Sequence, residues 1–372
     1  MVYLDNAATT RVSVQAADAA RGAMLEAWGN PSSGHALGFA AERLMRSSRA
    51  AVAKAIGAKE DEIFFTSGGT EANNLAILGT ARALKKSADH IIISAVEHPS
   101  VIKSAQRLRE EGFDVTEIAP DKFGRISADD VAAALTPRTA LVSVMLVNNE
   151  LGAVMPVAQI SQLIKKSGSR ALLHCDAVQA FGKMPFTVSR LGCQLLSVSG
   201  HKIHAPKGVG ALYIAKGIKK PLPLCFGGEQ ESRIRPGTEA LPNIAAFAEA
   251  VRNIGGGNDI AALNTYAREK LIALGCTINS PEDGSPYILN FSTGCIKSET
   301  MLNFLSSKEI YVSSGSACSK GKLSHVLTAA RLEHHIADSA VRLSFSGENT
   351  TEDIDILCEA VAQALGTLAR FR

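Results

Sequence analysis

The chain has 372 residues, of which 46% are hydrophobic, so it can form two domains or one large domain around a sizeable core. Its 39 basic and 36 acidic residues leave a net charge of +3, without a long block of like charge. We therefore expect neither nucleic acid nor a membrane as a partner. The first residues do not resemble a secretory signal and no apolar run reaches membrane-spanning length, so a cytoplasmic location is the default expectation.

The cysteine pattern points to a reducing environment. Seven cysteines occur without a C-x-x-C pair, which fits neither a disulfide framework nor a structural zinc site, and no metal is expected. Most of them should be reduced core residues, and one is a candidate for a reactive thiol. The seven are Cys175, Cys193, Cys225, Cys276, Cys295, Cys318 and Cys358.

From about residue 60 onward, short apolar runs alternate with longer amphipathic stretches, which is typical of βα units around a mainly parallel sheet. Many of these runs end in a polar or glycine-bearing cluster. Because open α/β sheets bind ligands beyond the carboxyl ends of their strands, we expect the clusters to converge on one crevice. Seven strands are predicted, at Glu62–Phe65, His90–Ala95, Asp114–Ile118, Ala140–Val147, Ala171–Cys175, Leu195–Val198 and Ala211–Ile214.

Three glycines after Ile254 mark the best candidate for a domain boundary, since they favour a flexible connection and the βα rhythm weakens after them. The sequence thus predicts a large domain at 15–254 and a smaller α+β domain at 255–372. An N-terminal segment at 1–14 is expected to join the smaller domain.

The run Thr66-Ser-Gly-Gly-Thr70 follows a predicted strand and precedes an apolar-periodic helix, so its amides could bind a phosphate at a helix N-terminus. A simple tight turn is the alternative. Asp176 ends another strand, with Gln179 three residues on; a carboxylate there can hold a proton on a heteroaromatic nitrogen, or it can merely cap the next helix.

Lys202, in Ser199-Gly-His201-Lys202, ends a further strand, where a crevice can activate its amine for Schiff-base formation; an isolated lysine is more often a solvated charge. His98 could stack on an aromatic cofactor and exchange protons near neutral pH, or be structural. Asn149 could contact cofactor or substrate, or serve only the chemistry of its turn.

Cys318 lies in a polar, glycine-bearing stretch whose nearby lysines favour the nucleophilic thiolate, although a lone loop cysteine is more often inert. Arg342 lies in an alternating, strand-like run. Its guanidinium could clamp a substrate carboxylate, or form a structural ion pair.

Together these segments resemble the NifS/IscS type of cysteine desulfurase, a branch of the class V aminotransferase-like pyridoxal-phosphate enzymes of fold type I. The resemblance runs almost from end to end. Its motifs are Tyr3-Leu-Asp-Asn-Ala-Ala-Thr-Thr, Gly29-Asn-Pro-Ser-Ser-Gly-His35, Phe65-Thr-Ser-Gly-Gly-Thr-Glu-Ala-Asn-Asn-Leu, Glu97-His98, Val147-Asn-Asn-Glu-Leu-Gly, His174-Cys-Asp-Ala-Val-Gln, Ser199-Gly-His-Lys, Pro206-Lys-Gly, Gly237-Thr238 and Ser313-Ser-Gly-Ser-Ala-Cys318.

The resemblance implies that pyridoxal 5'-phosphate is the cofactor and that Lys202 forms the covalent link to it. Asp176 would pair with the ring nitrogen, His98 would stack on the ring, and Cys318 would carry sulfur as a persulfide. Gln179 and Asn149 would contact the ring oxygen, and Arg342 would bind the substrate carboxylate. The phosphate would be held by Gly69, Thr70, Ser199 and His201, with Thr238 reaching across from the partner of a homodimer.

The implied reaction converts L-cysteine to L-alanine and passes sulfur to an iron–sulfur scaffold or a tRNA or cofactor thiolation enzyme. Ala205 and Pro236 depart from the family's usual glycine and serine, and the stretch after Cys318 is slightly shorter. Three alternatives remain: another class V aminotransferase, a selenocysteine lyase, and a non-catalytic partner in sulfur transfer. Cys318 and Lys202 together favour the desulfurase.

Overall fold

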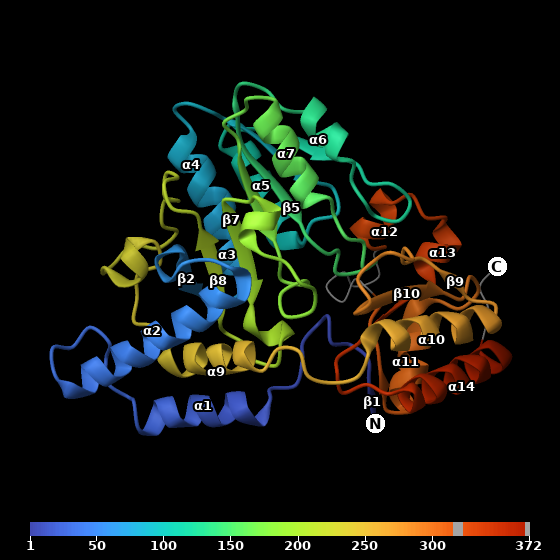
Figure 1. The fold of residues 1–372 in the computed structure, drawn as a ribbon. Helices are drawn as coiled ribbons and strands as arrows, with labels where there is room; N and C mark the ends of the chain where they lie inside the picture. The colour runs from blue at the N-terminus through green and yellow to red at the C-terminus, as the bar shows by residue number, and fades with distance from the viewer. Residues whose placement is uncertain (315–322, 369–372) are drawn as a thin grey trace.

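The structure is a computed structural model, which describes residues 1–314 and 323–368. This part of the chain contains three sheets, and the largest has seven strands in the order β2-β8-β7-β6-β5-β3-β4 (Figure 1). Its strands are β2 (Ile63–Thr66), β3 (His90–Ser94), β4 (Asp114–Ile118), β5 (Thr139–Met145), β6 (Leu172–Asp176), β7 (Leu195–Ser199) and β8 (Gly210–Ile214). All seven predicted strands are confirmed, each to within two residues at either end.

The large sheet is mainly parallel, as predicted. Only β8 runs against its two neighbours, β7 and β2, so the other six strands share one direction. Every residue of β3, β5 and β7 is buried. Helices on both faces explain why these strands read as continuous apolar runs rather than as an alternating pattern.

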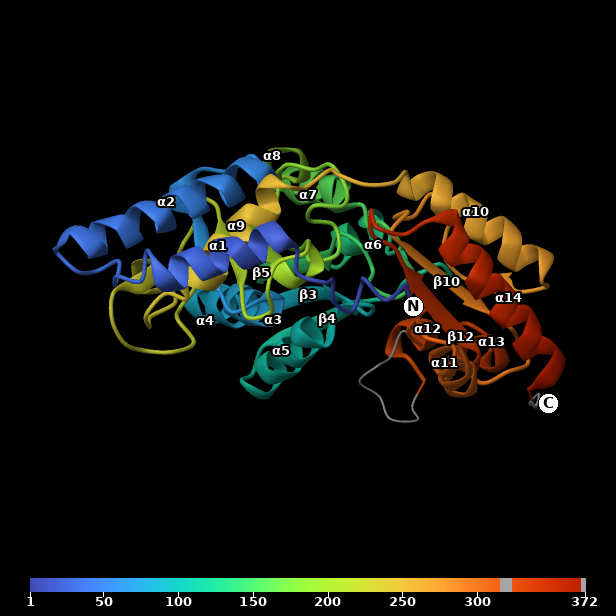
Figure 2. The ribbon, with the colours of Figure 1, turned by 90° about the horizontal axis from the view of Figure 1, so that it is seen from below.

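Helices cover both faces of this sheet. Figure 2 shows α1, α2 and α9 on one side and α5 on the other. The segment from α3 to α4 is one continuous helix interrupted by a π-helical turn at Leu75–Gly79. The helices of this region are α1 (Val14–Leu25), α2 (Ala36–Ile56), α3 (Gly69–Asn74), α4 (Thr80–Leu84), α5 (Pro99–Glu110), α6 (Ala128–Ala133), α7 (Val157–Lys166), α8 (Val188–Leu191) and α9 (Leu241–Arg252).

A second hydrophobic core lies in the C-terminal part of the chain, where an antiparallel sheet of β12, β10 and β9 packs on helices. Its strands are β9 (Thr277–Ile278), β10 (Ile288–Ser292) and β12 (Ala340–Ser344), and its helices are α10 (Ile260–Ala273), α11 (Ser298–Ser307), α12 (His325–Ala329), α13 (His334–Asp338) and α14 (Thr351–Thr367). The N-terminus joins this part, because β1 (Val2–Tyr3) pairs with β11 (Ile310–Tyr311) and Val2 and Leu4 are buried in the second core. The domain limits at 14 and 254 stay predictions.

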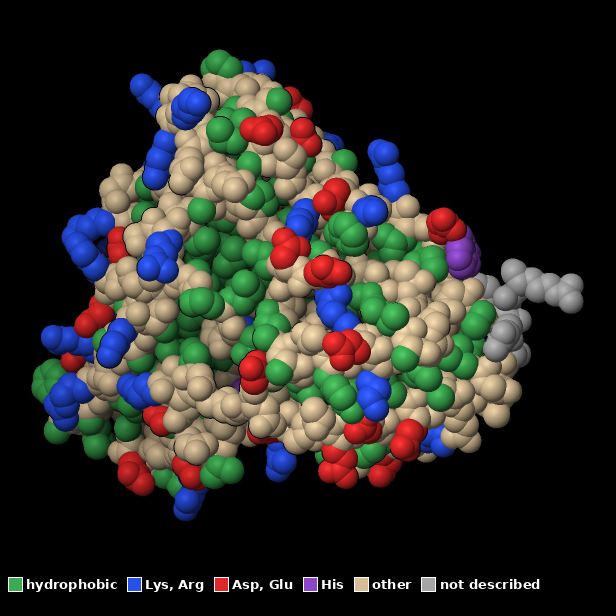
Figure 3. All heavy atoms as spheres, turned by 45° about the vertical axis from the view of Figure 1, so that its right-hand side comes forward, with side chains coloured by type: hydrophobic (Ala, Val, Ile, Leu, Met, Phe, Trp, Pro, Cys, Tyr) green, Lys and Arg blue, Asp and Glu red, His purple; other side chains and the backbone are tan. Residues whose placement is uncertain are grey.

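Basic and acidic side chains both occur across the molecular face drawn in Figure 3. A search of the described helices for one long and apolar enough to cross a bilayer finds none.

Candidate active site

The polar clusters predicted at the strand ends meet at one edge of the large sheet. Because β6 lies between β5 and β7 with parallel pairing, Asp176 at its end lies opposite Met145 on one side and Ser197 on the other. Thr66 and Ser199 both pair with Gly210, so the glycine-bearing turn after β2 lies beside the end of β7. The sheet therefore places the turn, the aspartate and the lysine at a common edge.

Lys202 ends the short 3-10 turn that follows β7, and its Nζ donates to the carbonyl oxygens of Ala7 and Ala8, each at 2.7 Å. Burial lowers the pKa of this lysine to about 8, and the positive charge of Arg342 acts in the same direction. A lysine amine with such a pKa is partly neutral near pH 7, and the neutral amine is the nucleophile.

Asp176 is buried, and its two carboxylate oxygens have different partners. Oδ1 accepts from the backbone N–H of Val178 at 2.9 Å, so the aspartate does cap a turn. Oδ2 accepts from Nδ2 of Asn73 at 2.7 Å. Gln179 lies close by, and its Nε2 donates to the carbonyl of Ala7, one of the two that receive Lys202.

His98 is the N-cap of α5 and is connected to Asp176 by hydrogen bonds through Ser100 and Asn73. Its Nδ1 lies 2.7 Å from Ser100 Oγ, which in turn accepts from Asn73 Nδ2 at 2.9 Å. Burial lowers the pKa of His98 and the positive charges of Lys202 and His325 add to this, against the opposite effect of Asp176. The neutral imidazole is therefore favoured.

Asn73 and Ser100 were not predicted from the sequence as site residues. Both are buried polar residues near a glycine turn or a histidine of interest, at Thr70-Glu-Ala-Asn73 and His98-Pro-Ser100. That proximity was the only available signal. It did not show that the two side chains face one another, because 27 residues separate them in sequence.

The turn after β2 closely approaches the strand ends. Gly68 has φ of 149°, which disfavours other residues, and a Cβ on Gly69 would lie 2.7 Å from a methyl group of Val178. Ser199 Oγ is buried with no hydrogen-bond partner among the described residues. An unpartnered buried hydroxyl beside a helix N-terminus suits an anion.

Thr70 lies at the start of α3, after this turn, and His201 lies in the 3-10 turn that follows β7. His201 Nδ1 lies 3.2 Å from Thr9 Oγ1, and burial lowers the pKa of His201 to about 4, so it is neutral at pH 7. Thr70 is exposed, near the start of α3. Both residues thus offer neutral hydrogen-bonding groups.

Arg342 is buried on β12 and reaches from the second sheet to the first. Nη2 donates to Asp5 Oδ1 at 2.7 Å and Nη1 to the backbone oxygen of Asn149 at 2.9 Å. Nε is buried without a partner among the described residues. The ion pair considered from the sequence is therefore present, with Asp5, and the N–H of Nε remains for another acceptor. Asn149 itself lies in an Asx turn formed by the preceding residue, Asn148, whose Oδ1 accepts from the backbone N–H groups of Glu150 and Leu151.

Cys318 lies outside the described residues, in the segment 315–322. The described residues before and after that segment both contact the site. Ser313 exchanges two backbone hydrogen bonds with Arg342, and Ser324 donates to the buried carboxyl of Glu150. Burial raises the pKa of Glu150 to about 7, so the carboxyl that accepts from Ser324 changes its charge near neutral pH.

Thr238 lies on the surface. It is exposed, three residues after Arg235, whose Nε donates to Glu71 Oε1 at 3.1 Å. No contact within the described part of the chain places Thr238 against the turn at Gly69, so its assigned contact with a partner's phosphate stays a prediction.

Most of the described cysteines are buried, as expected. Cys175, Cys193, Cys276 and Cys358 are buried and Cys295 is half-buried, whereas Cys225 is exposed. Cys225 follows β8 in an irregular surface loop, so it is the exposed member of the described cysteines.

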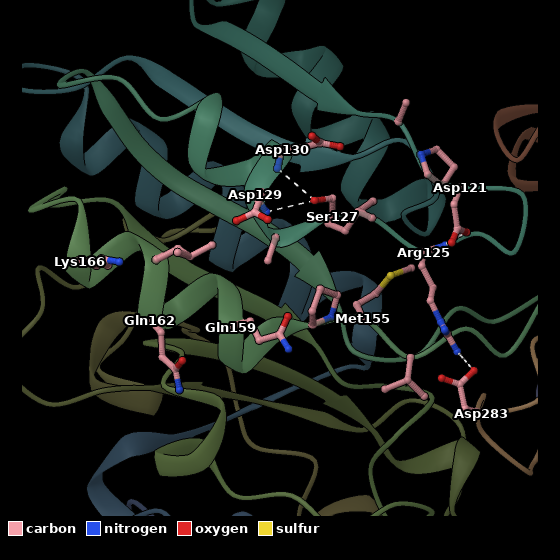
Figure 4. Close-up of a pocket in the computed structure, with 17 residues that line it drawn as sticks. Asp121, Arg125, Ser127, Asp129, Asp130, Met155, Gln159, Gln162, Lys166 and Asp283 are labelled. Carbon is pink, nitrogen blue, oxygen red and sulfur yellow. Dashed lines mark hydrogen bonds and ion pairs between the residues drawn. The ribbon is translucent and has the colours of Figure 1, made fainter.

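The described residues also line cavities, some away from these strand ends and one beside Lys202. One of about 1130 Å³ lies beside α6 and α7, where Arg125 forms an ion pair with Asp283 and Ser127 accepts from the start of α6 (Figure 4). None of the predicted site residues is among those drawn there. A second cavity, of about 500 Å³, is lined by Lys202 and Lys183.

The fold and the arrangement at the strand ends agree with comparisons across known proteins. The chain belongs to the family described as aminotransferase class-V, whose model matches residues 2–357.

Its relatives are more specific than that family name. The chain is 39% identical to "Cysteine desulfurase IscS" of Methanosarcina thermophila, covering 99% of this chain and 92% of the relative, and 42% identical to the "NifS/IcsS protein homolog" of Lactobacillus delbrueckii subsp. bulgaricus, covering 95% and 94%. A solved "NIFS-LIKE PROTEIN" superposes with a TM-score of 0.92 at 34% identity, covering 99% of this chain and all of that one. A structure described as "SspA in complex with cysteine" gives 0.84 at 32%, covering 94% and 100%.

Proposed function

We propose that this protein is a cysteine desulfurase, which uses pyridoxal 5'-phosphate held by Lys202 to convert L-cysteine to L-alanine and passes the sulfur to Cys318. The observation that carries the proposal is the meeting of three groups. The half-buried amine of Lys202, whose pKa is lowered, and the buried Arg342 from the other sheet both contact residues 5–8. Gln179, three residues after the buried Asp176, contacts the same stretch at Ala7.

The residues present fit this cofactor. Lys202 offers a primary amine for its aldehyde, and Asp176 offers a carboxylate for a protonated ring nitrogen. The unpartnered hydroxyl of Ser199, the turn at Gly69 and the neutral ring of His201 offer donors for a phosphate. The cofactor ring and its oxygen would be contacted by His98, Gln179 and Asn149. The phosphate would also be contacted by Thr70 and by Thr238 of a second subunit.

Once bound, the cofactor would supply a sink for the electrons left at the substrate α-carbon. The chain's own groups do the rest. Lys202 Nζ takes and returns the α-proton, for which a pKa of about 8 is well placed. Asp176 would hold a proton on the ring nitrogen. Arg342 binds the substrate carboxylate, for which Nε has no partner among residues 1–314 and 323–368 and the contact with Asp5 can be exchanged.

Sulfur transfer is assigned to Cys318. Its thiolate attacks the substrate sulfur, a new S–S bond forms, the C–S bond breaks, and its electron pair passes to the carbon skeleton, which takes up protons to become alanine. Five positions separate Cys318 from Ser313, whose backbone pairs with Arg342. A thiol reductant or an acceptor protein then removes the sulfur.

The other parts of the proposal concern partners and place. We assign the protein to a homodimer in the cytoplasm that delivers sulfur to an iron–sulfur scaffold or to a tRNA thiolation enzyme. The relatives named IscS and NifS support this pathway. The structure described as a complex with cysteine supports the substrate.

The decisive experiment quantifies alanine and sulfide released from L-cysteine in the presence of a thiol reductant. Equal amounts of the two products, lost in Lys202→Ala, would support the proposal. Production of pyruvate or of a transamination product instead would assign the chain to another class V activity. The same assay with selenocysteine distinguishes a cysteine desulfurase from a selenocysteine lyase, which requires a strong preference for selenium.

A further inference from the structure

Two buried side chains, Asn73 and Ser100, connect Asp176 to His98 and have no role in the mechanism above. Asn73 is 1% exposed, and its Nδ2 lies 2.7 Å from Asp176 Oδ2 and 2.9 Å from Ser100 Oγ. Because an ionised carboxylate can only accept, the amide nitrogen must be the atom that faces Asp176. Its two hydrogens are then directed to Asp176 and to Ser100.

The second hydrogen of Asn73 determines the orientation of the Ser100 hydroxyl. Ser100 Oγ accepts from Asn73, so its own hydrogen must point to another acceptor, and His98 Nδ1 lies 2.7 Å away. The backbone N–H of Ser100 is directed to the same nitrogen, at 3.1 Å. A ring nitrogen that accepts two hydrogen bonds carries no hydrogen of its own, so the ring hydrogen lies on Nε2.

We propose that Asn73 and Ser100 are positioning residues that fix the tautomer of His98, holding its ring neutral with the hydrogen on Nε2. This inference deepens the proposed function and rests on it, since it assigns His98 the role of a neutral N–H donor toward cofactor or substrate. Asp176 orients the Asn73 amide, the amide orients the Ser100 hydroxyl, and the hydroxyl selects the tautomer of the imidazole.

The charged groups around His98 do not produce this result by themselves. Asp176 favours the imidazolium, whereas Lys202 and His325 oppose it. A net charge effect would alter the pKa of His98 but would not select one ring nitrogen. The two donors on Nδ1 do select it, and each of them also favours the neutral ring, so removing one should raise the pKa of His98.

The chain offers a matched control for a test of Asn73. Oδ1 of Asn73 is buried without a partner among the described residues, so Asn73→Leu keeps the shape and removes only the two donated bonds. Asn74, the next residue, donates instead to the carbonyl of Thr70 and accepts from Ser104. Asn74→Leu therefore makes the same substitution on the same helix and leaves the side-chain bonds from Asp176 to His98 in place, since Ser104 donates to the backbone oxygen of Ser100 and not to its hydroxyl.

The experiment follows the imidazole nitrogens by NMR in cofactor-free protein labelled with ¹⁵N-histidine, across a pH series. The chain has nine histidines, and His98→Gln identifies the signal of His98. In the wild type we expect an unprotonated Nδ1 and a protonated Nε2. Ser100→Ala should raise the pKa of His98 by roughly half to one pH unit, the effect of losing one hydrogen bond.

Asn73→Leu should raise the pKa likewise and populate the form with hydrogen on Nδ1, while Asn74→Leu leaves both readouts unchanged. A wild-type ring protonated on Nδ1, or equal effects of the two leucine variants, would overturn the inference. If Asn73→Leu does not fold, Ser100→Ala decides alone, and an unchanged pKa of His98 in that variant rejects the inference. These readouts need no cofactor, so failure to release alanine would count against the proposed function and not against the positioning role of Asn73 and Ser100.

Discussion

Lys202 is expected to titrate near pH 8 in the cofactor-free protein, because burial and the charge of Arg342 both disfavour its ammonium form. At pH 7 a lysine with that pKa is neutral in about a tenth of the molecules, whereas a lysine at 10.5 is neutral in about 0.03%. The neutral amine is the reactive species. Lys202 should therefore react with an aldehyde roughly 300-fold more readily than an unperturbed lysine of equal access.

The assay mixes cofactor-free protein with pyridoxal phosphate between pH 6 and 10, stops the reaction with borohydride at short times, and maps the labelled peptides. Label should appear first on Lys202, with an initial rate that is half-maximal near pH 8. Lys202→Arg should lose this early label and Lys207→Arg, a change at an exposed neighbour, should retain it.

Two results would refute this reasoning. Early labelling that falls mainly on other lysines would mean that Lys202 does not hold the cofactor. Labelling of Lys202 with a midpoint near pH 10 would mean that the site does not lower its pKa, so that the contacts with the carbonyls of Ala7 and Ala8 hold an ordinary ammonium group.

Four other outcomes are expected. Cys318→Ser should still bind cysteine but stall alanine release, and in the wild type mass spectrometry should find one added sulfur on the Cys318 peptide, removable by dithiothreitol; wild-type rates in the variant would rule Cys318 out. Sedimentation at low micromolar concentration should give an active dimer, and a fully active monomer would contradict the cross-subunit role of Thr238. Glu231→Ala should cost about 3 kcal/mol or more of unfolding free energy, because it removes the two-point contact with Arg49 at 2.6 and 2.8 Å; equal denaturation midpoints would contradict this. Burial raises the pKa of Glu97 to about 8, so the folded state keeps a proton that the unfolded state releases. The free energy of unfolding of the wild type should therefore fall between about pH 4.5 and 8, by at most about 5 kcal/mol. Denaturation of Glu97→Gln at several pH values should show a smaller fall.

The sequence alone determined the large sheet and the positions of the principal polar groups. Continuous apolar runs identify buried strands locally, as in β3 and β7, and the residues that follow those runs must lie at strand ends whatever the rest of the fold does. Asp176 and Lys202 were identified for this reason. The family motifs then supplied the expected chemistry, and the class V family match supports that assignment.

Only the tertiary structure decided which groups touch. Asp5 meets Arg342 across 337 positions, and Asn73 meets Asp176 across 103. The partners of Lys202 are backbone carbonyls of Ala7 and Ala8, which leave no mark on a side-chain pattern. The lowered pKa of Lys202 arises from burial between these elements, and burial is a property of the packed molecule: a sequence can indicate that a lysine ends a strand, but the free-energy cost of its charge depends on what surrounds it.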